Sequence, residues 1–222
     1  WHPKMKPYLF TERNGVHVIN LEMTAEKVKE AMAVVTEMVA NGKVIVFVTT
    51  KPQGKEVVRA AAIDCGMPYL VERWVGGLLT NFTEIKKLIK KYNMLKTQQA
   101  NGELERYTKK EQLEIAKSLT KMDITLAGLA TLEKMPDALF IASVQREKTA
   151  VTEAVSMRVP IIGICDSNAN PDKVDHIIPA NDDAVNAITM IVGLMAEAVK
   201  EGKKEAEKRK EIKKVEPVVV AS

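Results

Sequence analysis

Residues 49–56, with the sequence TTKPQGKE, come directly after an apolar run and partly match a phosphate-binding loop at the end of a strand. The full loop pattern has glycine where Thr49 stands, because backbone N–H groups must close around the phosphate. It also has serine or threonine where Glu56 stands, to bind Mg²⁺. These departures argue against nucleotide hydrolysis. The basic residues of the segment remain candidates for contacts with nucleic-acid phosphates, namely Lys51, Lys55 and Arg59.

A second segment whose residue types could carry out chemistry, residues 166–172 (DSNANPD), follows another apolar run. An aspartate at the end of a strand can accept a phosphoryl group or bind Mg²⁺. Asp-Ser-Asn and Asn-Pro are also strong turn formers, because their side chains bond their own backbone, and we favour the turn. We therefore expect no cofactor, with a weak Mg²⁺ site near Asp166, Asp182 or Asp183 as the alternative. Asp182 and Asp183 are more simply charges at the N-terminus of a helix.

Signatures of other enzyme classes are missing from the sequence. Neither Gly-x-Gly-x-x-Gly nor Gly-x-Ser-x-Gly occurs, and His2, His17 and His176 have no cysteine or carboxylate at a catalytic spacing. Cys65 and Cys165 lack a metal-binding spacing, and a chain of 222 residues folds without disulfides, so we expect reduced thiols in a reducing compartment. The sequence therefore favours a protein that is not an enzyme.

Positive charge is concentrated in residues 84–121, which contain ten Lys or Arg and five acidic residues, while the rest of the chain is close to neutral. This placement favours contact between a projecting element and a polyanion, with an ordinary solvated helix face as the alternative. Arg73 beside Trp74 suits RNA, by phosphate pairing and by stacking on an unpaired base, with Trp74 as a core anchor as the alternative. The predicted RNA-binding residues are Lys4, Lys6, Lys51, Lys55, Arg59, Arg73, Trp74, Asn81, Lys86, Lys87, Lys90 and Lys91.

A corner at residues 73–82 (RWVGGLLTNF) organises these residues, because two glycines there separate a short apolar strand from a long lysine-rich helix. We expect Trp74 and Asn81 to fix the corner, and the side chain of Thr80 or Asn81 to cap the helix. The helix keeps apolar spacings of three and four as far as position 95, and Asn101-Gly102 interrupts it.

A second helical pattern returns after this interruption, so the insertion is predicted to be an antiparallel, coiled-coil-like hairpin. Its expected apolar face contains Leu113, Ala116 and Leu119. The lysines of the outgoing helix cover its remaining surface, where they can reach phosphates.

The remaining chain alternates apolar runs with amphipathic segments, which predicts alternating strands and helices. Unbroken apolar runs are typical of strands that are covered on both faces, as in a parallel sheet. We expect strands at residues 16–21, 44–48, 68–71, 137–142, 161–165 and 176–178. Thr24 should cap the first helix and Asn181 the last. The predicted fold is α/β, a three-layer αβα sandwich with a doubly wound, mainly parallel, flavodoxin-like sheet and an inserted α-helical hairpin.

Three parts of the chain follow from this pattern. They are an αβα domain at residues 1–83 and 122–200, a protruding helical hairpin at 84–121, and a charged C-terminal tail at 201–222 that begins as a frayed helix. Prolines at positions 3 and 7 predict an extended arm for residues 1–10. No apolar run approaches the roughly 18 residues that cross a membrane. Because the chain opens at Trp1 without an initiator Met, we expect a segment of a longer protein.

Five motifs in order give the sequence a family resemblance. They are WHPKM at 1–5 with Pro7-Tyr8, RNGVH at 13–17, RWVGG at 73–77 with LTNF at 79–82, PDALF at 136–140, and IPANDDA at 178–184. On these residues the chain resembles the bacterial-type small-subunit ribosomal protein S-two family over nearly its whole length, up to about residue 200. It departs from the family at His2, usually Asn, at Ala180, usually Gly, and in the loop at residues 143–147.

The resemblance implies a structural, non-enzymatic constituent of the small ribosomal subunit that supports translation. Such a protein would bind small-subunit rRNA between head and body, contact neighbouring ribosomal proteins and help to seat the mRNA-capturing protein S-one. It would be cytoplasmic and ribosome-bound, with an organellar ribosome as the alternative, and we expect no membrane partner and no homo-oligomer. The competing hypothesis is a flavodoxin-like nucleotide- or phosphate-binding enzyme or switch.

Overall fold

A five-stranded parallel sheet forms the centre of the structure, a computed structural model that describes residues 1–215. Its strands are β3 (Ile45–Val48), β4 (Tyr69–Leu70), β5 (Ala138–Ile141), β6 (Ile161–Cys165) and β7 (His176–Pro179). They lie in the order β4-β3-β5-β6-β7, and every neighbouring pair is parallel. The sheet strand that comes first in the chain therefore lies between the second and the third. This is the predicted flavodoxin-like order.

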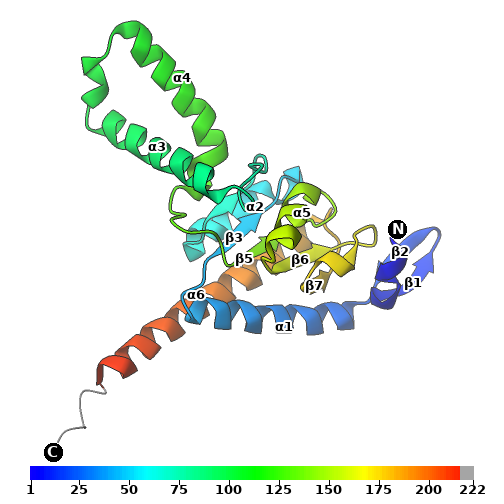
Figure 1. The fold of residues 1–222 in the computed structure, drawn as a ribbon. Helices are drawn as coiled ribbons and strands as arrows, with labels where there is room; N and C mark the ends of the chain where they lie inside the picture. The colour runs from blue at the N-terminus through cyan, green and yellow to red at the C-terminus, as the bar shows by residue number, and fades with distance from the viewer. Residues whose placement is uncertain (216–222) are drawn as a thin grey trace, which may run out of the picture.

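Helical layers cover both faces of this sheet, so every residue of β3, β5 and β6 is buried. One face packs against α1 (Leu21–Ala40), α2 (Pro52–Cys65) and α6 (Val185–Val215), and its core includes an edge-to-face ring pair, Phe47 and Phe140, with centroids 5.0 Å apart. The other face packs against α5 (Lys148–Met157), residues of the corner and the base of the helical insertion. The arrangement, visible in Figure 1, confirms the predicted three-layer sandwich.

The helical insertion consists of α3 (Phe82–Ala100) and α4 (Lys109–Leu126), which project together from the body of the molecule (Figure 1). A 3-10 helix (Glu103–Arg106) joins them at the tip, and a second one (Ala127–Leu129) leads back to the sheet. The hairpin is thus longer at both ends than the predicted residues 84–121. No residue from 97 to 118 is buried, so only the base of the hairpin has a packed core.

The predicted apolar face of the returning helix was right at Leu119 and wrong at its other two positions. Leu113 and Ala116 are exposed, whereas Ile115, Leu119 and Met122 pack toward the core. These three are four and three residues apart and lie on one side of α4. Toward the tip the same stripe continues through a polar residue, Gln112, which obscured it in the sequence.

The N-terminal segment also differs from its prediction. Residues 3–8 form a 3-10 helix rather than an extended arm, and Pro3 is tolerated in its first turn, where its missing N–H is not needed. Residues 16–21 were expected to begin the parallel sheet. Instead β2 (Val16–Ile19) pairs antiparallel with β1 (Leu9–Arg13) in a separate two-stranded sheet. Asn14 and Gly15 both have positive φ, 52° and 78°, which suits the tight turn of a β-hairpin.

The cap of the first helix also lies elsewhere than predicted, and the last helix begins later than predicted. Asn20, not Thr24, caps α1, because its Oδ1 accepts from the N–H of Glu22 at 3.0 Å. Thr24 instead donates its hydroxyl to the carbonyl of Pro179 at 2.6 Å, which ties α1 to β7. Asn181 accepts from the N–H groups that follow it, but α6 itself begins at Val185.

The charged segment from residue 201 is helical as predicted, but it continues α6 as far as Val215 without interruption and is not a separate, frayed helix. Gly202 is buried on α1, where a Cβ would lie only 2.5 Å from the carbonyl oxygen of Thr36. Arg209 reaches Glu37 of α1 at 2.9 Å. These contacts attach the helix to the body. The loose tail predicted for the last residues, 216–222, lies outside the described part of the chain. Within the described residues, no helix combines the length and the apolar character that a membrane span requires.

Candidate nucleic-acid interface

The crevice between the carboxyl ends of β3 and β5 is where a sheet of this topology binds its ligand. Here a carboxylate of the chain occupies it. Glu147 is only 4% exposed, and its Oε1 accepts from both the N–H and the hydroxyl of Thr50, at 2.5 and 2.7 Å. A bound phosphate would need this same backbone N–H. This amide is therefore not free for a phosphate, which counts against the flavodoxin-like enzyme or switch.

Lys51, a predicted phosphate contact, lies beside this crevice in internal ion pairs. Its Nζ is 2.6 Å from Asp182 and 2.8 Å from Asp183. Burial acts to lower the pKa of Lys51, but the hydrogen bonds to the two carboxylates outweigh burial and leave that pKa raised. Ser143 also donates its hydroxyl to Asp182 at 2.5 Å. The lysine is thus charged and engaged inside the protein.

The carboxylates predicted as an alternative Mg²⁺ site do come together. One oxygen from each of Asp166, Asp182 and Asp183 lies within 4.8 Å of the others. The ammonium group of Lys51 already contacts two of the three carboxylates. Asp166 further accepts from the backbone N–H of Ser167 at 2.5 Å and of Asp182 at 3.2 Å, in keeping with the predicted turn.

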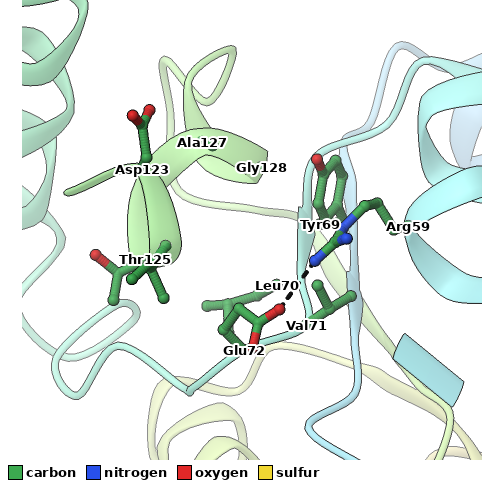
Figure 2. Close-up of a pocket in the computed structure, with 10 residues that line it drawn as sticks. Arg59, Tyr69, Leu70, Val71, Glu72, Asp123, Thr125, Ala127 and Gly128 are labelled. Atoms are coloured by element: carbon green, nitrogen blue, oxygen red, sulfur yellow. Dashed lines mark hydrogen bonds and ion pairs between the residues drawn. The ribbon is translucent and has the colours of Figure 1, made fainter. Parts of the chain in front are cut away.

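Lys55 and Arg59, the next two predicted phosphate contacts, both bind Glu72. The Lys55–Glu72 distance is 2.6 Å and the Arg59–Glu72 distance is 2.9 Å. The hydrogen bond from Lys55 is the main reason why the pKa of Glu72 is lowered, and burial opposes it. Figure 2 shows Arg59 joined to Glu72 on one side of a cavity of about 580 Å³, with Asp123 and Thr125 at the base of α4 on the other side. Gly128 closes this base tightly, since a Cβ there would lie 2.2 Å from the carbonyl oxygen of Tyr69.

The corner at residues 73–82 is organised by a residue that the sequence analysis did not identify, Glu153 of α5. Its buried carboxylate accepts from Trp74 Nε1 and from the N–H of Gly77, both at 2.9 Å. It also accepts from the N–H of Leu79 at 3.1 Å, and from the N–H and hydroxyl of Thr80 at 3.4 and 3.3 Å. One side chain therefore binds the whole turn.

Ionisation of this carboxylate is favoured by its surroundings. Burial acts to raise the pKa of Glu153, but the hydrogen bonds from Trp74 and the corner amides outweigh burial and leave it lowered. The signal in the sequence was a glutamate on an otherwise apolar helix face, between Val151 and Ala154. A buried anion that accepts several N–H bonds stays charged at neutral pH.

Trp74 and Asn81 have different positions at this corner. Trp74 is 8% exposed and uses its N–H on Glu153, so the structure supports the core-anchor alternative over stacking on an RNA base. Asn81 stands at the N-cap position of α3, but neither its side chain nor that of Thr80 makes the predicted cap hydrogen bond. Gly77 has φ +85°, a conformation in which glycine avoids strain.

The remaining predicted contacts are cations nearer the surface. Lys4 forms an ion pair with Asp172, and Lys87 lies 2.7 Å from Glu84. Within the described residues, the others have no carboxylate partner: Lys6, Arg73, Lys86, Lys90 and Lys91. All of these except the half-buried Lys86 are exposed. The predicted cations thus fall into three groups: internally paired cations around the sheet, the surface-paired Lys4 and Lys87, and cations at the arm, the corner and α3 that have no carboxylate partner among the described residues.

Both cysteines are free, in line with the expected reduced thiols, and both are buried. Burial raises the pKa of the Cys165 thiol to about 12, so it is a poor nucleophile at neutral pH. At the end of the sheet Glu147 takes the Thr50 amide, and Glu153 holds the corner that carries the basic hairpin, an arrangement that fits a structural protein better than an enzyme.

Comparisons with known proteins identify the family. Residues 1–202 match the family model described as Ribosomal protein S2. The chain is 44% identical over 202 residues to "Small ribosomal subunit protein uS2" of Porphyromonas gingivalis, covering 91% of this chain and 72% of that protein. It is 42% identical over 210 residues to the protein of the same name from Parabacteroides distasonis, covering 95% and 76%. The chain belongs to the ribosomal protein S2 family, whose members are structural ribosomal proteins and not enzymes.

Proposed function

We propose that this protein is a structural constituent of the small ribosomal subunit and supports translation by binding small-subunit rRNA between head and body. The observation that carries the proposal is the set of free cations on the projecting hairpin and its corner. Arg73, Lys90 and Lys91 are exposed and have no ion-pair partner among the described residues. Contacts of this kind are mostly to phosphates, so they position an RNA without reading its sequence.

The paired cations have a second role in this proposal. Lys51, Lys55 and Arg59 can contact RNA only by exchanging a carboxylate for a phosphate. They therefore contribute less to RNA affinity than the free cations, and their main effect is on the stability of the sheet edge. Lys4 is in an intermediate position, because its partner Asp172 is itself half exposed.

Protein partners belong to the same proposal. The small sheet of β1 and β2 exposes several large apolar side chains, with Phe10 75% exposed, and a two-stranded sheet of this kind has little core of its own. Such surfaces support contacts with neighbouring ribosomal proteins, including the seating of the mRNA-capturing protein S-one. The protein would be ribosome-bound in the cytoplasm, with an organellar ribosome as the alternative.

The test is co-sedimentation with small ribosomal subunits that lack this protein. In the hairpin variant, Lys86, Lys90 and Lys91 are changed to Gln. A matched control changes three exposed lysines elsewhere: Lys29, Lys43 and Lys204. If the hairpin meets phosphates, the first variant loses occupancy, and the slope of log affinity against log salt falls by roughly 2 to 3. The control should bind as the parent does.

Truncation of the hairpin provides a second, independent test of the proposal. Residues 84–121 include buried base residues such as Ile85 and Leu119, so their complete removal would damage the core. Replacing only the unburied residues, 97–118, with a short Gly-Ser linker avoids this problem. If subunit occupancy is insensitive to salt and to both changes, the proposal is wrong.

A further inference from the structure

Two adjoining cavities connect the end of the sheet to the hairpin. The first, about 470 Å³, lies over the ends of β3 and β5 and is lined by Lys55, Arg73, Arg146 and Thr149, among others. The second, also about 470 Å³, lies between the corner and α4 and is lined by Arg73, Lys121 and Met122, among others. Both cavities have Arg73, Trp74 and Gly76 in their linings, so they adjoin at these residues, and we refer to the two together as the groove.

The charges of this groove favour an anion along its whole length. Arg146, Arg73 and Lys121 are exposed at its start, middle and end, and none has an ion pair within the described residues. Of the two carboxylates in the lining, Glu72 is neutralised by ion pairs with Lys55 and Arg59. Glu147 accepts hydrogen bonds from Thr50 and keeps its charge, but its carboxylate is buried and the exposed charges of the lining are the cations. The free guanidinium groups of two arginines provide the forked donors that bind phosphate oxygens in pairs.

The geometry points to a strand of RNA as the occupant, and we propose that its phosphodiesters lie along this groove against Arg146, Arg73 and Lys121. A mononucleotide fits less well, because Glu147 already uses the Thr50 amide that would hold a terminal phosphate. Apolar side chains in the second cavity, Val75, Leu88 and Met122, offer surface to a ribose or base. This inference rests on the proposed RNA-binding function and adds Arg146 and Lys121 to its binding residues.

The experiment measures anisotropy of a fluorescent single-stranded oligouridylate with the full chain across a series of salt concentrations. Arg146→Gln is compared with Lys148→Gln, two residues away, and Lys121→Gln is compared with Lys117→Gln, one helical turn away. Both control lysines are exposed but do not line the groove. Each groove variant should lose roughly two- to fivefold in affinity, the effect of one exposed charge pair. Its salt slope should fall by about 0.7.

Three outcomes would overturn the inference. The groove variants could bind as the two controls do, or the parent could fail to bind the oligonucleotide. Alternatively, inorganic phosphate or ADP, at the same phosphate concentration as the RNA, could displace it, which would reveal a small-anion site. Co-sedimentation with small subunits separates this inference from the proposed function. A parent that fails to co-sediment refutes the function, whereas a parent that co-sediments while Arg146→Gln and Lys121→Gln match their controls refutes only the groove.

Discussion

Removing the carboxylate of Glu153 should unfold the corner from which the hairpin projects. In Glu153→Ala, the N–H groups of Trp74 and Leu79 lose their acceptor in a buried place, and each unsatisfied buried donor costs about 1–3 kcal/mol. The N–H groups of Gly77 and Thr80 are only partly buried and can bond to water. We therefore expect a loss of about 3–5 kcal/mol, a large share of the 5–15 kcal/mol that stabilises a typical domain.

Urea unfolding followed by tryptophan fluorescence measures this loss directly, because Trp74 donates to Glu153. A Trp1→Phe background removes the signal of the second tryptophan, which is exposed. The control is Glu84→Ala, which removes a glutamate that is paired on the surface at the start of α3 and should cost about 0–1 kcal/mol. A loss for Glu153→Ala no larger than that of this control would refute the reasoning.

Acid provides a second test of the same carboxylate. The folded pKa of Glu153 is lowered from its ordinary value of 4.5, so its stabilisation is fully present above pH 4.5 and is lost as pH falls through the folded pKa. Glu153→Gln cannot ionise and keeps only one accepting oxygen, so it should lose roughly half as much stability as alanine at neutral pH. It should also lose this part of the acid dependence. An unchanged acid limb in the variant would show that Glu153 does not titrate as argued.

Three further perturbations test the packing at the base of the hairpin and the internal ion pair of Lys51. Gly128→Ala places a methyl group against a backbone carbonyl of β4 and should lower stability by about 1–3 kcal/mol in thermal unfolding, whereas Gly193→Ala, which meets nothing within 4 Å, should not. Burial and a hydrogen bond to Asp123 raise the pKa of Tyr92 to about 12. The stability of the hairpin should therefore fall as pH rises from 10 to 12. Tyr92→Phe should remove one late step from the ultraviolet absorbance titration of the tyrosines. Lys51→Met leaves Asp182 buried without its cation and should cost about 3–5 kcal/mol in urea unfolding; a loss below 1 kcal/mol would contradict the internal role of Lys51.

Local sequence patterns predicted the sheet, its helical layers and the inserted hairpin, because each is encoded by apolar residues close together in the chain. The strand at residues 16–21 was misplaced for a physical reason. The sequence of a short strand indicates that it is extended, but not which strand it pairs with. The turn at Asn14-Gly15 pairs this strand with the segment just before it. The turn residues were visible in the sequence, and two φ-positive residues between short strands are a strong hairpin signal.

The candidate site could be predicted only in part, because its decisive contacts join distant positions. Lys51 and Asp182 are 131 residues apart, and Trp74 and Glu153 are 79 apart. A sequence shows that these groups are charged or polar, but not that they neutralise one another. The free cations of α3 were easier to identify, since neighbours on a helix surface are three or four residues apart and few carboxylates occur at that spacing.

Helix α5 explains why this fold serves as a scaffold. Glu147 at its N-terminal end takes the backbone amide at the end of β3, and Glu153 takes the amides of the corner. In a ligand-binding protein of this topology, such amides at strand ends are left free for an anion that comes and goes. Here two carboxylates, Glu147 at the N-cap of α5 and Glu153 within the helix, accept from these amides, which connects the end of β3 and the corner of the hairpin through one element. Arg73 and Arg146, which line the cavity beside these amides, are exposed and so are available to the RNA that we propose as a ligand.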